Sequence, residues 1–239
     1  MPKHVLLNNV EHKGLKVIAT RSAAFGDDIM SAIIVPAEFR NVQACYPIVF
    51  QKRSDTGQFQ PLALFGFQER ENLFLTPAGW EATYIPLSVL RQPFLIGGRR
   101  SAQDAAPPQL VVHVDLDSPR ISESQGEPLF LEYGGNTEYL SRACAMLHEL
   151  HKGLEATPAF VEALVSLELL ESFVLDVDLK DGSRNRLAGF YTVHEDRLRS
   201  LPGPDVAKLH ANGVLELAYM VVASMAHFRD LIDRRNRRL

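Results

Sequence analysis

Alternating apolar and polar positions predict a strand-rich first half of the chain. A hairpin is expected where the aromatic and β-branched run 46–52 is followed by turn residues at 54–57 and a returning run over 59–67. Proline at the start of an apolar segment favours the first helical turn, so short helices are predicted at 35–42 and after Pro86. Further strands are predicted at 15–19, 72–75, 94–96 and 110–116.

The second half of the chain shows mainly helical periodicity. Asn136 or Thr137 is expected to cap a helix that ends at Gly153, and a new helix is expected to begin at residues 157–158. A second hairpin is predicted over 173–193 because Asp-Gly turn chemistry divides two alternating runs. The remaining predicted elements are helical: 195–200, a stretch capped by Asp205, and a long final helix after Gly213 that is buried on most sides.

These elements define an α+β fold with a strand-rich N-terminal half and a helix-rich C-terminal half. The C-terminal half contains one β-hairpin and a long C-terminal helix. A length of 239 residues suits one large domain, so we expect a single domain over 1–239 with a subdomain boundary near 120–135. The polar segment 97–108, rich in Gly, Ala and Pro, is predicted to be an exposed loop.

Composition and charge narrow the classes of function. The chain is 46% hydrophobic and 23% charged with a net charge of -4, which suits a folded protein and gives no sign of nucleic-acid binding. The basic C-terminal segment, residues 234–238, is expected to be a solvated helix end. Two distant cysteines, Cys45 and Cys144, favour a reducing compartment. With no signal peptide or spanning run, we expect a cytoplasmic protein.

Several strings along nearly the whole chain together resemble the SapC family, a bacterial group named from a surface-layer gene cluster. They lie at residues 21–26, 35–39, 46–50, 64–67, 71–75, 80, 84–86, 91–94, 115–120, 189–191 and 234–236. The resemblance is not to the membrane permease of antimicrobial-peptide transport that shares the name, because this sequence has no spanning segment.

The resemblance implies no established activity and no catalytic residues. Genes of this family lie near those of flavin-dependent tryptophan halogenases, cupin-like iron oxygenases and TonB-dependent receptors. That neighbourhood implies an accessory role, with a halogenase or a cupin-like oxygenase as the partner. The family label also leaves open a structural role in a surface layer, although the missing signal peptide argues against export.

One pair of residues has the spacing of a metal site. His113 and Asp115 lie two apart on a predicted strand and therefore on one face, as in the facial triad of non-haem iron oxygenases. The alternative is a strand-ending turn that includes Asp117. The third ligand of such a site could be His151, His194, His210 or His227. His194 is more simply the cap of the next short helix. Phosphate-loop, dinucleotide and nucleophile-elbow motifs are missing.

A dense aromatic stretch over residues 46–94 gives the main candidate binding surface. Most of its rings are expected to pack a β-rich core, while some line a groove for a peptide or ligand. Arginines beside them could clamp a carboxylate or phosphate, or form ion pairs with Glu38, Glu69 or Glu81 instead. The candidate binding residues are Arg21, Arg70, Trp80, Tyr84 and Arg91.

The leading functional hypothesis is therefore a non-catalytic accessory protein that binds a protein or peptide partner, with no cofactor and no resident metal. Whether any catalysis occurs stays open, as does the oligomeric state. The alternatives are an iron-dependent oxygenase that uses His113 and Asp115, and a surface-layer component.

Overall fold

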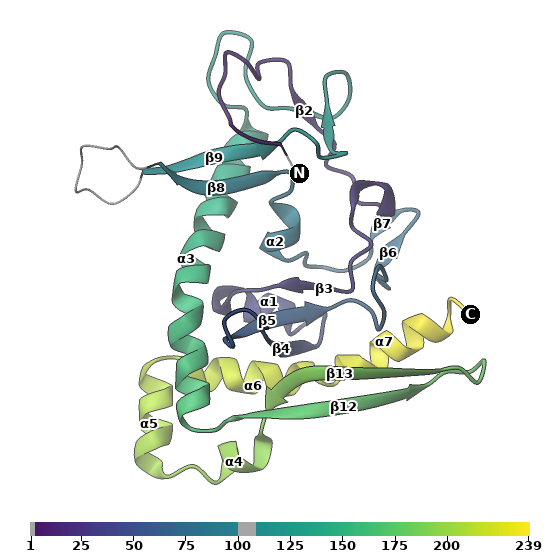
Figure 1. Ribbon diagram of the computed structural model, residues 1–239, viewed down its shortest axis with the longest axis vertical. Coiled ribbons are helices and arrows are strands. Elements are labelled where there is room, and N and C mark those ends of the chain that lie inside the picture. Colours follow the sequence, from purple (N-terminus) through teal and green to yellow (C-terminus); the bar gives the residue numbers. More distant parts are fainter. Residues whose placement is uncertain (1–2, 100–108) are drawn as a thin grey trace. The chain divides into compact units, whose positions relative to one another are not determined.

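The computed structural model describes residues 3–99 and 109–239 (Figure 1). Its strands pair antiparallel and its helices gather in the second half of the chain, so the predicted α+β class and layout are confirmed. Most of the loop predicted at 97–108 falls outside the described residues, and residues 97–99 belong to a strand. Within the described ranges no single helix is long and apolar enough to cross a membrane; only the bent pair Gly203–Ala211 and Val214–Asn236 passes by length and composition.

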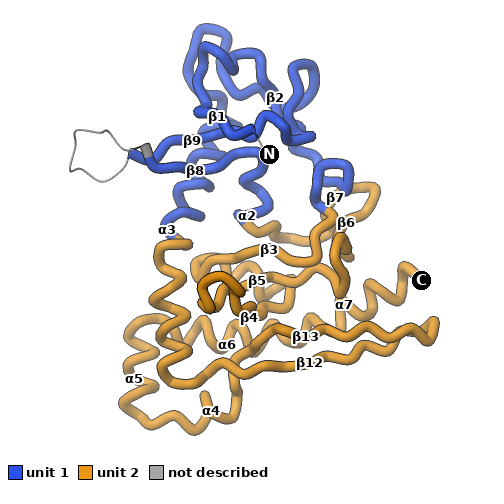
Figure 2. Tube along the Cα trace, viewed as in Figure 1, with its two compact units in different colours: residues 1–27, 87–152 blue, residues 28–86, 153–239 orange. Residues whose placement is uncertain are grey.

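The chain divides into two compact units, each built from two separate segments (Figure 2). Unit 1 contains residues 1–27 and 87–152, and unit 2 contains residues 28–86 and 153–239. Helix α3, Glu138–Ser166, contributes its first half to unit 1 and its second half to unit 2. The expectation of a single domain over 1–239 stays a prediction.

Unit 1 contains two small sheets and a compact apolar core. The first sheet has the order β1-β9-β8, and the second has the order β10-β2-β11. The elements are β1 (His4–Leu6), β2 (Lys16–Val17), η1 (Ala23–Phe25), α2 (Leu87–Leu90), β8 (Phe94–Arg99), β9 (Gln109–Asp115), β10 (Ile121–Ser122) and β11 (Glu127–Pro128). Phe94 and Val114 face each other across β8 and β9, and both pack with Leu140 and Leu147 of α3.

Unit 2 is organised around a five-stranded antiparallel sheet with the order β12-β13-β4-β5-β3. Its strands are β3 (Ser31–Ile33), β4 (Ile48–Lys52), β5 (Phe59–Leu64), β6 (Leu75–Thr76), β7 (Gly79–Trp80), β12 (Leu170–Asp178) and β13 (Arg184–Val193). Its helices are η2 (Pro36–Glu38), α1 (Phe39–Val42), α4 (Glu195–Arg199), α5 (Gly203–Ala211), α6 (Val214–Ser224) and α7 (His227–Asn236), together with the second half of α3.

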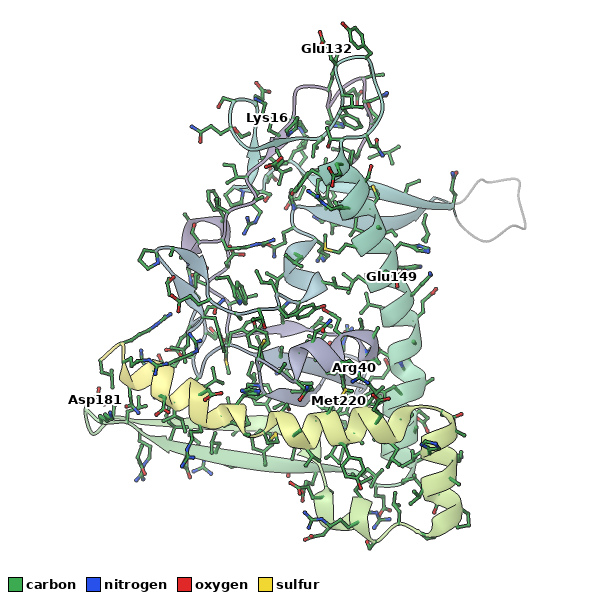
Figure 3. The ribbon with its side chains drawn as sticks, turned by 180° about the vertical axis from the view of Figure 1, so that it is seen from behind. Lys16, Arg40, Glu132, Glu149, Asp181 and Met220 are labelled. Atoms are coloured by element: carbon green, nitrogen blue, oxygen red, sulfur yellow. The ribbon has the colours of Figure 1, made fainter. Side chains whose placement is uncertain are left out.

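Both predicted hairpins are confirmed. In β4–β5, Ile48 lies opposite Ala63 and Lys52 opposite Phe59. In β12–β13, Asp181 lies at the tip of the hairpin (Figure 3), where its carboxylate accepts hydrogen bonds from the Ser183 backbone and hydroxyl. Local turn chemistry was sufficient to predict both hairpins.

Helix α3 contradicts the prediction of two helices separated at Gly153. It runs unbroken through Gly153 and Pro158 because apolar residues on both sides of them are buried along its length. The Thr157 hydroxyl donates to the Gly153 carbonyl at 2.8 Å inside the helix. The N-terminal cap was predicted correctly, since the Thr137 hydroxyl accepts from the Leu140 backbone N–H at 3.2 Å.

The final helix also differs from the prediction. It is divided into α6 and α7, which lie beside β13 (Figure 1), and it buries one face rather than most of its sides. Tyr219 on the opposite face is 51% exposed. The buried face is tied to the sheet by Ser224, whose hydroxyl accepts from the Ile48 N–H at 2.9 Å. The apolar positions outside this face are only partly covered.

Three smaller predictions were misplaced by a few residues. The first predicted strand shrinks to Lys16–Val17, and the strand predicted at 72–75 forms at Leu75–Thr76 instead. Pro202, not Asp205, caps α5, and Asp205 lies in its first turn. In each case the pairing partner or the proline, rather than local propensity, decides where the element begins.

Candidate functional site

The five candidate binding residues belong to different units. Arg21 and Arg91 lie in unit 1, whereas Arg70, Trp80 and Tyr84 lie in unit 2. Each group has contacts within its own unit that account for its position.

Arg21 belongs to a buried ion cluster around Asp27. The Asp27 carboxylate accepts from Arg21 at 3.3 Å, from Arg120 at 2.6 Å and from the Ser22 N–H at 2.8 Å. Arg120 is 1% exposed and its guanidinium lies over the Phe25 ring. Burial, and then the charge of Arg120, lower the pKa of Arg21. This cluster joins two strings that carry the family resemblance, and it has a structural role in unit 1.

The other two arginines also have local partners. Arg91 donates to the Phe94 carbonyl at 2.9 Å, and burial lowers its pKa. Arg70 is 84% exposed in its side chain and pairs with Asp28 at 3.0 Å. Its φ of 59° places it in the left-handed region, so its backbone forms a turn.

Trp80 and Tyr84 form a hydrogen-bonded network with the buried Tyr46. The Trp80 indole N–H donates to the Tyr46 hydroxyl at 2.8 Å, and that hydroxyl donates to the Tyr84 carbonyl. The Tyr84 hydroxyl in turn donates to Glu38 at 2.8 Å. Burial raises the pKa of both tyrosines far above the ordinary value, with Glu38 adding to the effect at Tyr84. Both residues thus complete a core network.

The aromatic stretch packs into cores as the sequence predicted. Tyr46 makes edge-to-face contacts with Phe65 and Phe74, with ring centroids 5.0 and 4.7 Å apart. Trp80 contacts Phe65 in the same way at 5.0 Å. Such pairs add to the stability gained from apolar burial.

We expect Tyr46→Phe to lower the free energy of unfolding by about 2 kcal/mol, because the Trp80 N–H and the Tyr84 carbonyl lose their partner inside the core. Trp80 is the single tryptophan of the chain and lies in unit 2, so its fluorescence in a urea titration reports this change. Tyr219→Phe, at a half-exposed tyrosine, is the matched control and should leave the transition unchanged. Equal stability of the two variants would contradict the structural role of the network.

The candidate iron site gains no support from its surroundings. Asp115 ends β9 in a turn, where its carboxylate accepts from the Asp117 N–H at 3.1 Å, as the alternative interpretation predicted. The His113 ring lies against Gly97, whose missing side chain leaves room for it. In the described part of the chain no group of three His, Cys, Asp or Glu residues could hold a metal ion.

The other histidines considered as ligands have their own positions. His194 caps α4, as predicted, by accepting from the Arg197 N–H at 3.4 Å. His227 lies between the Asp230 carboxylate and the Gln43 carbonyl, at 2.7 and 3.0 Å.

The basic C-terminal segment is only in part the solvated helix end that we predicted, because Arg237 and Arg238 are exposed whereas Arg234 and Arg235 are partly buried. Arg238 donates to the carbonyls of Asn72 and Leu75 at 3.0 and 2.6 Å, and Arg235 meets Glu71 at 3.2 Å. These guanidiniums satisfy polar groups of the loop before β6 and of Leu75, its first residue. A further ion pair of unit 2 joins Arg40 of α1 to Glu216 of α6.

The strongest candidate for a binding site in unit 2 is an open groove of about 700 Å³ between the β4–β5 hairpin and the second half of α3. Its apolar lining includes Ile33, Phe59, Pro61, Leu154, Val161 and Val165. Ile33, Leu154 and Val165 are 39%, 44% and 40% exposed, which is high for large apolar side chains. We call this feature the groove.

The groove has a signal in the sequence. Leu154, Pro158, Val161 and Val165 recur at helical spacing and form an apolar stripe on α3. That stripe could have been recognised as an unpartnered face. Its companion, the β4–β5 hairpin, is distant in sequence.

The described part of the chain thus has an α+β fold with an open apolar groove in unit 2. The family model SapC matches residues 7–231, and the chain belongs to the SapC family. This confirms the resemblance inferred from the sequence strings. No curated protein and no solved structure matches the chain.

Proposed function

We propose that the chain is a non-catalytic binding protein that takes an apolar peptide segment of a partner protein into the groove. The observation that carries this proposal is the exposure of Ile33, Leu154 and Val165 along one depression of about 700 Å³. Exposed apolar side chains gathered in a concave surface are typical of interaction sites. A strand hairpin and a rigid helix form the walls, which suits binding with little rearrangement.

The charges at the rim restrict the peptide further. Arg53 is paired with Asp55 at 2.6 Å and is therefore neutralised within the hairpin. Lys52 lies over the Phe59 ring, with no carboxylate partner in the described part of the chain. Glu162 of α3 also lines the groove, so the rim carries charges of both signs. The complementary peptide therefore has apolar side chains flanked by charged groups of both signs.

The family resemblance supports a class of partner. A flavin-dependent halogenase or a cupin-like iron oxygenase would supply such a segment, and the protein would act as its accessory. Peptide binding in the groove can be tested without knowing the partner protein, so the two parts of the proposal are tested separately.

We expect peptides selected from a random linear library on the immobilised protein to be rich in apolar residues, with charged residues of both signs beside them. Val165→Lys should weaken the binding of a selected, fluorescently labelled peptide by at least about tenfold, or ~1.4 kcal/mol, because a charge replaces an apolar wall residue. Fluorescence anisotropy with the full chain measures this change.

The matched control is Val174→Lys, which introduces the same charge at a valine of β12 that is 52% exposed and outside the groove. Peptide affinity should stay within about twofold of the unsubstituted protein. Peptides that bind both variants equally, or a selection that enriches no apolar sequence, would overturn the proposal.

A further inference from the structure

A second depression of unit 2 lies along one side of α7, with a volume of about 360 Å³. This is at the lower end of the range for small-molecule pockets. We call it the α7 pocket. His227, Asp230 and Arg234 line it from α7 and Arg237 from the C-cap of that helix, and the four share one face because they are three or four residues apart. Cys45 and Thr83 line it from other segments.

Two of the three basic side chains at this pocket have partners. Arg234 lies over the Phe74 ring at 4.3 Å and meets Glu81 at 3.6 Å. The His227 ring lies between the Asp230 carboxylate and the Gln43 carbonyl, at 2.7 and 3.0 Å. Glu81 and Asp230 are thus each in contact with a neighbouring basic side chain.

Arg237 is the cation that remains. Across residues 3–99 and 109–239, its side chain has no ion-pair or hydrogen-bond partner, although it lines the pocket. Within these ranges, Arg237 is therefore the one charged side chain of the pocket lining without a partner of its own. A guanidinium in this setting favours a planar anion that it can bind through two hydrogen bonds.

We propose that the α7 pocket binds a small molecule with a single carboxylate, held by Arg237. The carboxylate matches the guanidinium in shape and in charge. The Thr83 hydroxyl, which exchanges a hydrogen bond with the Cys45 thiol at 3.1 Å, offers a second polar contact in the same pocket. Ala44, Ala82 and Phe74 form an apolar part of the lining, which suits a compact apolar group on the ligand.

The nearby acids disfavour phosphate as the ligand. A dianion would add a second negative charge near Glu81 and Asp230, and among the described residues Arg237 is the only guanidinium of the lining without a carboxylate partner. Monocarboxylates avoid this repulsion. The site is independent of the groove, which none of its lining residues shares.

The test uses ligand-observed saturation-transfer NMR on the full chain with acetate, propionate, benzoate and phenylacetate as probes. The neutral amides of the four acids and inorganic phosphate serve as comparison ligands. We expect at least one carboxylate to bind, with its amide and phosphate binding roughly tenfold more weakly or not at all. Failure of all four acids to bind, or equal binding of acid and amide, would overturn the proposal.

Arg237→Gln should weaken the carboxylate that binds by roughly tenfold, since the amide keeps the side-chain polarity but removes the charge. Arg229→Gln is the matched control, because Arg229 is an exposed arginine of the same helix that does not line the pocket. An equal loss of affinity in both variants would show a general effect of net charge and would also overturn the assignment.

Discussion

Replacing Asp27 with Asn is expected to lower the free energy of unfolding by about 3–5 kcal/mol, the usual effect of removing one partner from a buried ion pair. Asp27 is fully buried and holds both Arg21 and Arg120. Without its charge, two guanidiniums remain close together inside unit 1 with no carboxylate between them. The Arg120 side chain, at 1% exposure, cannot reach water to compensate.

Circular dichroism in a urea titration is the appropriate measurement for this variant, because the single tryptophan lies in unit 2 and does not report on unit 1 directly. Asp28→Asn is the neighbouring control: Asp28 pairs with an arginine that is 84% exposed, so the loss should stay below about 1 kcal/mol. An equally small loss of unfolding free energy for Asp27→Asn would contradict the burial of the ion cluster.

The ion partners of Arg21 could not be inferred from the sequence. Arg21 looked available because nothing near it in the sequence suggested Arg120, which lies about a hundred residues further on. The partners of Trp80 and Tyr84 are also non-local, since both depend on Tyr46 and Glu38. Residue type indicated polar contacts for these side chains, but only the fold shows which partners they have within the protein.

Elements whose signal is local were predicted well. The hairpins β4–β5 and β12–β13 depend on turn residues beside alternating runs, and the cap at Thr137 depends on its own helix. The continuous α3 was missed because Gly and Pro normally interrupt helices, and burial of the flanking residues outweighs this tendency. The groove was missed because its two walls come from residues 33–61 and 154–165.

The groove does not coincide with the binding surface predicted from the sequence. The sequence pointed to an aromatic and arginine-bearing surface in the first half of the chain, where most of the aromatic rings are buried. Of the five candidate binding residues, Arg70 is exposed and the other four are partly exposed. The groove instead combines one wall from the first half with a helix from the second. A peptide bound there would contact aliphatic residues, with Phe59 and Lys52 at its edge.

Gly153→Val is expected to lower the free energy of unfolding by about 3 kcal/mol, although valine is a slightly better helix former than glycine. A side chain at Gly153 would place its first carbon 2.5 Å from a Val35 methyl group, well inside van der Waals contact. Val35 is fully buried and cannot move aside freely. The measurement is Trp80 fluorescence in urea, because both residues belong to unit 2.

Two further variants separate the clash from the effect of a β-branched residue in the helix. Ala156→Val, at an exposed position one turn along α3, should cost less than about 1 kcal/mol. Combining Gly153→Val with Val35→Ala should recover about 1 kcal/mol or more relative to the sum of the single changes, because the shorter side chain makes room for the new one. Additive effects would contradict the close approach of α3 to Val35. Non-additive effects would show that the missing side chain at Gly153 allows α3 to pack closely against Val35. This packing would then hold α3, which forms one wall of the groove, in position.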